Sequence, residues 1–345
     1  TSIISGYKRL GNWVLWSYFI LTLFSMLFIT SAVGAVTSGF FQNLLQTSAY
    51  GIINQIVLFC FCGLFLSYGQ YNLLDRIIKI IGLTLITSTL ISFFLVLKKG
   101  AITHNLLPNI EYSNNDLLFI IALMGWMPTA VDLSSWNSLW TLARIKQTNF
   151  RPTLKQTIFE FNIGYFSSAV LSICFLTLGA YLMYGTNNHF SNNSAMFAHQ
   201  VIKLYTQTIG DWTYLIISVS GFSIMFGTCI GVFDGYARAA NECIKLLFTK
   251  KVKLKSTYKT IIWFLSIGSV VIIKLFGNHL TELVDMATTI SFMIAPFVAL
   301  ANYKLVLSPY LKDSDIPPAW LKYLAIIGIA YLFGFGFLFI HSKII

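Results

Sequence analysis

Long apolar blocks separated by short polar links run through the whole of this 345-residue chain. A helix that crosses a bilayer needs about 20 predominantly apolar residues, and block after block meets that length. The first, fourth, sixth and eighth blocks are too long for one straight crossing, so we expect them to tilt, break or extend beyond the bilayer. The pattern predicts nine spanning helices, at residues 11–42, 49–69, 73–97, 115–143, 156–185, 209–244, 257–277, 281–308 and 319–342.

The composition excludes an ordinary soluble domain, because 56% of the residues are hydrophobic and only 10% are charged, against about 25% charged in soluble domains. With alternating crossings, 18 lysines and arginines fall in links on the N-terminal side and 5 on the other side. The positive-inside rule then predicts a multi-pass protein of the plasma or inner membrane, with a cytoplasmic N-terminus and an external C-terminus. This placement also explains the net charge of +11 without nucleic acid as a partner.

Cysteine and histidine, the usual ligands of resident metal sites, are poorly arranged for one here. His189 and His199 lie ten residues apart in the link 186–208, which we predict to be a solvated external loop. No nucleotide-binding glycine loop, Ser/His/Asp order or HExxH pattern occurs. The sequence therefore predicts neither an enzyme nor a bound cofactor. The cysteines are expected to be small apolar fillers: Cys60, Cys62, Cys174, Cys229 and Cys243.

The fourth block carries the most informative polar residues. Pro128 removes a backbone donor, and Gly125 makes the backbone beside it more flexible. We therefore expect the helix to break near mid-membrane and to free the carbonyl oxygens near Met124 and Gly125. Secondary transporters build their ion sites at such breaks. Met127 offers a thioether at the break, a soft ligand that suits transition metals. Asp132 follows as an intramembrane carboxylate. Taken singly, each has a structural explanation: a kink, core packing, or a contact with a neighbouring helix.

Two later blocks add candidate residues. Asp234 and Arg238 are four residues apart and can pair on one helix face, either as a structural ion pair or as a gate. In the eighth block, Thr288 stands among hydroxyl side chains ahead of Pro296, which we expect to break the helix. Membrane threonines mostly bond back to their own helix, but the Thr288 hydroxyl would also complement Met127 as a metal ligand.

The first block contains a run of small residues, which normally indicates close helix packing. These residues are Thr30, Ser31, Gly34, Thr37 and Gly39.

At Met127-Pro128 the chain resembles the Nramp family of divalent-metal transporters, whose sixth helix carries a Met-Pro pair at its break. The segments 124–140, 234–238 and 286–292 look like a divergent bacterial branch of that family, and the resemblance covers essentially the whole chain. It implies an all-α, leucine-transporter-type bundle of inverted repeats (the APC superfamily). The nine helices then correspond to the family's helices three to eleven, so residues 1–345 form one transmembrane domain that lacks the first two.

The resemblance also shows departures at the site. The Asp-Pro-Gly-Asn break of the family's first helix is not found, and the histidine after Met-Pro is Thr129. The family's acidic proton-relay pair falls near Ser31 and Gly34, which leaves Asp132 as the candidate substitute proton carrier. The glutamine of the family's tenth helix falls near Thr288.

We therefore expect a secondary transporter that moves a divalent cation, manganese or iron, by alternating access, with proton coupling. Its partners are the transported ion and the lipid bilayer. The alternative is the same fold carrying magnesium, an amino acid or another small solute. A structural or signalling membrane scaffold is a third interpretation, and the polar residues at mid-depth argue against it.

Overall fold

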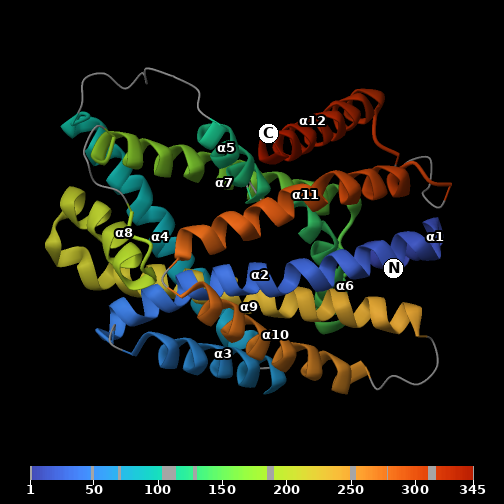
Figure 1. Cartoon of the computed structure of the whole chain (residues 1–345), viewed down its shortest axis with the longest axis horizontal. Helices are drawn as coiled ribbons and strands as arrows, with labels where there is room; N and C mark the ends of the chain where they lie inside the picture. Colours follow the sequence, from blue (N-terminus) through green and yellow to red (C-terminus); the bar gives the residue numbers. More distant parts are fainter. Residues whose placement is uncertain are drawn as a thin grey trace.

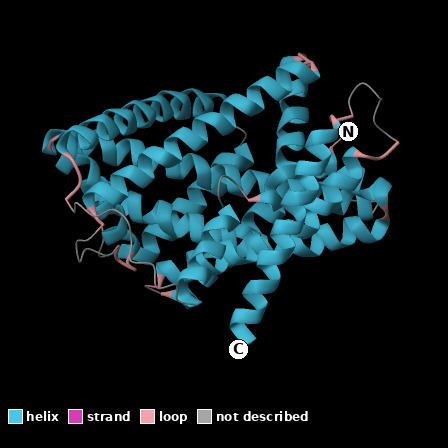
Figure 2. Ribbon diagram, turned by 90° about the horizontal axis from the view of Figure 1, so that it is seen from above, coloured by secondary structure: helices cyan, strands magenta, loops and turns pink. Residues whose placement is uncertain are grey.

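The computed structural model describes residues 2–47, 50–68, 71–102, 114–126, 130–184, 190–248, 254–277, 279–309 and 316–344. Within these ranges all regular structure is helical, as Figures 1 and 2 show. The α-helices are α1 (Ile3–Leu10), α2 (Asn12–Leu45), α3 (Gly51–Tyr68), α4 (Tyr71–Lys99), α5 (Asn114–Trp126), α6 (Ser134–Thr148), α7 (Leu154–Leu182), α8 (Ser194–Ile209), α9 (Tyr214–Leu247), α10 (Leu254–Phe276), α11 (Leu280–Val306) and α12 (Ala319–Ile344). Two 3₁₀ turns, η2 (Val131–Leu133) and η3 (Asp211–Thr213), precede α6 and α9.

Helices occupy all nine predicted positions, and most ends agree to within three residues. Among the described residues, six helices are long and apolar enough to cross a membrane, namely α2, α7, α9 (with η3), α10, α11 and α12. The helix α3 is apolar but shorter. The all-α class and the membrane character are thus confirmed, whereas the nine crossings, their orientation and the inverted-repeat arrangement stay predictions.

The helix α2 is the centre of the bundle and packs against α8, α9, α10 and α11 (Figure 1). Its small residues allow these close approaches. A Cβ atom added at Gly39 would lie 2.1 Å from the backbone oxygen of Ser194, at the start of α8. The Thr37 hydroxyl oxygen lies 3.1 Å from the Met225 carbonyl oxygen on α9. The small-residue face is therefore a packing face, as predicted.

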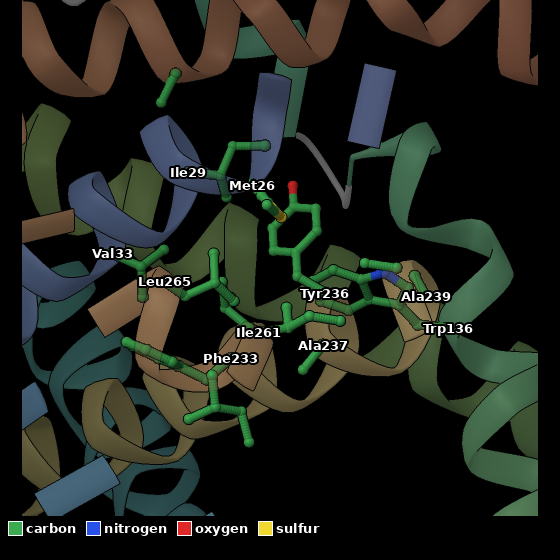
Figure 3. Packing of buried hydrophobic residues seen from close by; sticks show 14 of the residues in the cluster. Met26, Ile29, Val33, Trp136, Phe233, Tyr236, Ala237, Ala239, Ile261 and Leu265 are labelled. Carbon is green, nitrogen blue, oxygen red and sulfur yellow. The ribbon is translucent and has the colours of Figure 1, made fainter. Parts of the chain in front are cut away.

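The largest apolar cluster lies where α2, α9 and α10 meet, and it extends to the first turn of α6 (Figure 3). Its side chains leave little surface exposed, and the rings of Phe59 and Phe233 pack edge to face with centroids 5.4 Å apart. Interiors packed in this way deform little, so this cluster holds the first turn of α6 in a fixed position. The cluster includes Met26, Ile29, Val33, Trp136, Phe233, Tyr236, Ala237, Ile261 and Leu265.

The helices α7 and α12 lie at the edge of the bundle (Figure 1), and many of their large apolar side chains are exposed. In water such surfaces would be exposed apolar patches, whereas in a bilayer they face lipid. The helix α7 begins with a capping box formed by Thr153 and Gln156. The exposed side chains include Phe159, Phe166 and Leu176 on α7 and Trp320, Ile327 and Phe337 on α12.

The link predicted as a solvated loop over 186–208 is instead largely helical, because α8 begins at Ser194. The Asn193 side chain caps this helix by accepting hydrogen bonds from two backbone amides. Ala198, Ile202 and Tyr205 recur at helical spacing and are buried, and that periodicity is the signal the loop prediction missed. His199 lies on α8, with a ring nitrogen 3.3 Å from the Tyr214 hydroxyl, and His189 lies outside the described residues.

The expectation that Pro296 breaks its helix is wrong, because α11 runs without interruption from Leu280 to Val306 with Pro296 inside it. A proline removes only its own backbone donor, and membrane helices tolerate this where neighbouring helices hold them in place. Here α11 packs against α2, α5 and α12, which keeps it continuous.

The close approach at Gly39 gives a first prediction. Gly39→Ala should destabilise the protein by about 1–3 kcal/mol, because the new methyl group would overlap backbone atoms of Ser194 that cannot rotate away. The measurement is the melting temperature in detergent. Gly179→Ala on α7 is the matched control, because a Cβ there meets no atom within 4 Å. Equal melting temperatures for both variants would show that α8 does not seat on α2 in this way.

Candidate functional site

The fourth predicted span is interrupted, as expected, and its two parts are separate helices. The helix α5 ends at Trp126, Ala130 has extended backbone (φ −62°, ψ 131°), and α6 begins at Ser134 after η2. The last carbonyl groups of an α-helix have no partner within it, and Met124 and Gly125 belong to that last turn. Met127, Pro128 and Thr129 lie outside the described residues, so the role of the Met127 sulfur stays a prediction.

The end of α5 rests on α11 at two points. A Cβ added at Gly125 would lie 2.0 Å from the backbone oxygen of Thr288, so only glycine fits there. Next to it, the Trp126 indole nitrogen donates to the Ser291 hydroxyl at 3.2 Å. Two residues predicted for the site, Gly125 and Thr288, are therefore in backbone contact, and α11 covers the interruption.

The side chains of Met124 and Thr288 are already engaged. The Thr288 hydroxyl donates to the carbonyl oxygens of Val284 and Asp285, 2.9 and 3.0 Å away, which is the back-bonding typical of membrane threonines. The Met124 sulfur accepts a hydrogen bond from Tyr331 on α12 at 2.9 Å. As possible metal ligands, Met124 thus retains its backbone oxygen and Thr288 the lone pairs of its hydroxyl.

Asp132 lies on η2 and is buried between helices, only 6% exposed. Its Oδ2 atom lies 3.5 Å from the hydroxyl of Tyr236 on α9, and its Oδ1 atom is buried without a partner. One turn further along, the hydroxyl oxygens of Ser135 and Tyr18 on α2 are 2.5 Å apart. Asp132 is therefore a buried carboxylate with one oxygen that has no hydrogen-bond partner, and its role as proton carrier stays a prediction.

Asp234 is the second buried carboxylate of the described chain, and its oxygens are fully used. Arg238 donates to Oδ2 at 2.6 Å, the Trp140 indole nitrogen donates to Oδ2 at 2.9 Å, and the Tyr258 hydroxyl donates to Oδ1 at 2.5 Å. The predicted pairing of Asp234 and Arg238 is present, and it joins α6, α9 and α10. Asp234 and Arg238 also line a cavity of about 1050 Å³ between α6, α7 and α9.

Ser31 and Gly34, near which the resemblance is expected to place the family's acidic relay pair, are closely packed. The Ser31 hydroxyl bonds the Leu27 carbonyl oxygen at 2.6 Å and lies 3.3 Å from that of Ser269 on α10. A Cβ at Gly34 would lie 2.2 Å from the ring of Phe59. An acidic side chain at position 34 does not fit while Phe59 keeps its place.

No cluster of three or more His, Cys, Asp or Glu side chains that could hold a metal ion occurs among the described residues. All five cysteines are free and four of them are buried, as expected of apolar fillers. A methionine sulfur, together with backbone or hydroxyl oxygens, is a ligand set for a soft metal ion that lies outside such clusters.

Comparison with known proteins decides the family. Residues 6–342 match the model of the natural resistance-associated macrophage protein-like family, Nramp. The chain belongs to the Nramp family. An uncharacterised protein of Pasteurella multocida (strain Pm70) is 30% identical over 346 residues, which cover 99% of this chain and 78% of that relative. Nramp proteins are divalent-metal transporters and not enzymes, and the apolar helices of this Nramp chain agree with a multi-pass membrane protein.

Sequence reasoning missed the aromatic partners of the site in this Nramp chain. Tyr236, Trp140, Tyr258 and Tyr331 each place a hydroxyl or an indole nitrogen on a predicted site residue. Tyr236 and Trp140 stand inside the segments 234–238 and 124–140 that carried the resemblance, so their positions could have been noticed. Tyr258 and Tyr331 come from other parts of the chain, and only the folded bundle shows where they meet the site.

The network around Asp234 gives a second prediction. Asp234→Asn should destabilise the protein by about 1–3 kcal/mol in detergent, because the substitution removes the negative charge of the ion pair with Arg238. The expected loss is smaller than for a fully buried pair because the Arg238 side chain is 36% exposed and water screens part of its charge. Tyr258→Phe, which leaves the ion pair intact, should cost less. A melting temperature unchanged in Asp234→Asn would show that this network contributes nothing to stability.

Proposed function

We propose that this Nramp chain forms the pathway of a secondary transporter that carries a divalent transition-metal ion, Mn²⁺ or Fe²⁺, by alternating access and in symport with protons. The observation that carries the proposal is the interruption between α5 and α6, held against the candidate membrane span α11 by Gly125 and Trp126. Broken helices at the bilayer midplane are where secondary transporters bind their ions.

In this proposal the ion binds at the end of α5. The sulfur of Met127 is the soft ligand, and backbone oxygens of Met124 and Gly125 are hard ligands. The Thr288 hydroxyl stands next to them, because Gly125 rests on the backbone of Thr288. Thioether sulfur favours transition metals over magnesium and calcium, so Met127 would be the residue that selects the ion.

Asp132 carries the proton in this proposal. Ser31 and Gly34 leave no acid along the family's usual route, whereas Asp132 is buried, lies beside the interruption and has an unpaired oxygen. Asp234 is unsuited to this role, because Arg238 and two further donors hold its charge. Its network would instead keep α6 seated on α9 and α10, and a gating role for the Asp234–Arg238 pair remains a prediction.

The alternative cargo, magnesium or an amino acid, predicts a different selectivity. A hard ion or a carboxylate-bearing solute gains nothing from a thioether, so the Met127 sulfur would be irrelevant to it. Substitution of Met127 alone therefore distinguishes a transition-metal cargo from the alternative cargoes.

The test is Met127→Ala in the full-length protein reconstituted into liposomes. Uptake of Mn²⁺ should fall by about tenfold or more, and discrimination against Ca²⁺ and Mg²⁺ should decrease, because only oxygen ligands remain. Uptake is measured with a metal-sensitive dye inside the liposomes, with and without an inward proton gradient. Met196→Ala is the matched control, since it removes a thioether whose side chain is exposed on α8. Unchanged manganese uptake and selectivity in Met127→Ala would make the site assignment wrong.

A further inference from the structure

The two buried carboxylates of the described chain differ in how their charge is compensated. Asp234 receives three donors, and one of them is the cationic side chain of Arg238. The partners of Asp132 are neutral, namely the hydroxyl of Tyr236, 3.5 Å from Oδ2, and a backbone amide, and no ion pair to it is formed within the described part of the chain. A charge held by a cation is costly to remove, whereas a carboxylate with neutral donors alone can exist in either protonation state.

Tyr236 is fixed in place by its neighbours. Its ring is 2% exposed and packs edge to face with Trp136, with centroids 4.7 Å apart and planes at 81° (Figure 3). Trp136 in turn lies directly on the backbone of α9, because a Cβ at Gly235 would be 2.3 Å from its ring. The tyrosine ring therefore has no room to turn, and its hydroxyl stays between Asp132 and the neutral hydroxyl of Ser25 on α2, with which it also interacts.

No other charged side chain competes for this contact among the described residues. From α11, which packs against η2, the nearby polar side chain is the neutral amide of Asn302, bonded to Ser134 at 2.9 Å. The hydroxyl of Tyr236 is thus the side-chain group whose hydrogen bond to Asp132 changes in strength when the carboxylate gains or loses its proton. The other ionisable side chains near Asp132 and Tyr236 are Tyr7 on α1, Tyr18 on α2 and Cys243 on α9. All three are uncharged at neutral pH.

We propose that Tyr236 is a positioning residue for Asp132, whose hydroxyl sets the pH at which this carboxylate takes up and releases its proton. The inference rests on the proposed function, in which Asp132 is the proton carrier. The ionised carboxylate accepts the hydrogen bond more strongly than the protonated acid does. The proton comes from water on one side of the membrane, is carried as the carboxylic acid and leaves to water on the other side, while Tyr236 keeps its own proton.

The contact also links protonation to the position of α6. Asp132 lies on η2, directly before α6, and Tyr236 belongs to α9. Loss of the proton from Asp132 strengthens the bond between these two elements, and uptake of the proton weakens it. The start of α6 is consequently held more tightly when the site is unprotonated, which gives proton binding a mechanical effect at the interruption.

Tyr236→Phe tests this inference, because it removes one hydroxyl and leaves the ring packed on Trp136. Without the donor the ionised carboxylate is less stable, so the pH dependence of metal uptake in liposomes should move to higher pH. We expect a shift of about half a pH unit, less than for a short hydrogen bond to a charged group, because the contact is long. Tyr258→Phe is the matched control, since it removes a hydroxyl from Asp234 and should leave the pH profile in place.

A second measurement does not depend on transport. The infrared band of the protonated Asp132 carboxyl, identified by its loss in Asp132→Asn, is followed against pH in the purified protein. Its midpoint should move to higher pH in Tyr236→Phe. With ring-fluorinated tyrosine at position 236, a stronger donor of nearly the same shape, it should move to lower pH. If Tyr236→Phe does not fold, the fluorinated protein provides the same test.

The outcomes separate the two proposals. Midpoints that stay unchanged in both position-236 variants would overturn the role of Tyr236, even in a protein that transports manganese. Midpoints that move as expected in a protein without manganese uptake would support Tyr236 and count against the proposed cargo. An equal shift of the pH profile in Tyr258→Phe would also overturn the inference, because it would show a general loss of packing.

Discussion

Every backbone N–H and C=O group inside a bilayer has to find a partner within the protein, because lipid tails offer none. This constraint decides where the chain can leave the α-helical conformation. One such departure is the interruption between α5 and α6, where Ala130 has extended backbone and α11 lies against the chain. Gly125 allows the two backbones to touch at Thr288, and Trp126 fixes the end of α5 to Ser291. These contacts make the interruption a defined structural feature of the bundle.

A similar constraint applies to buried charge. Burying a carboxylate costs free energy unless hydrogen bonds or a cation compensate its charge, and the two buried carboxylates are compensated differently. Asp234 is surrounded by donors from three helices and serves to join them, with Arg238 next to a large cavity. Asp132 is left with one long contact and one unpaired oxygen. The arrangement around Asp234 favours stability, whereas the arrangement around Asp132 favours a change of protonation state.

The apolar blocks, the break near Pro128 and the packing face of α2 could be read from the sequence, because each depends on local composition and periodicity. The pairing of Asp234 with Arg238 was equally local, at helical spacing. The helix α8 was missed because its polar residues outweighed the spacing of Ala198, Ile202 and Tyr205. Pro296 was misjudged because the helices that hold α11 in place come from elsewhere in the chain. For the same reason, no local pattern could place Tyr236 beside Asp132 or Tyr331 beside Met124.

The ring of Phe59 fills the space beside Gly34, where a Cβ would lie 2.2 Å from it. This contact couples two positions of the core. An acid introduced at position 34 alone would collide with that ring, and a smaller side chain at position 59 alone would leave a cavity in the core. An acidic side chain at position 34 would therefore need a second substitution, at position 59, before the core could accommodate it. The side chains at positions 34 and 59, on α2 and α3, thus constrain each other's size.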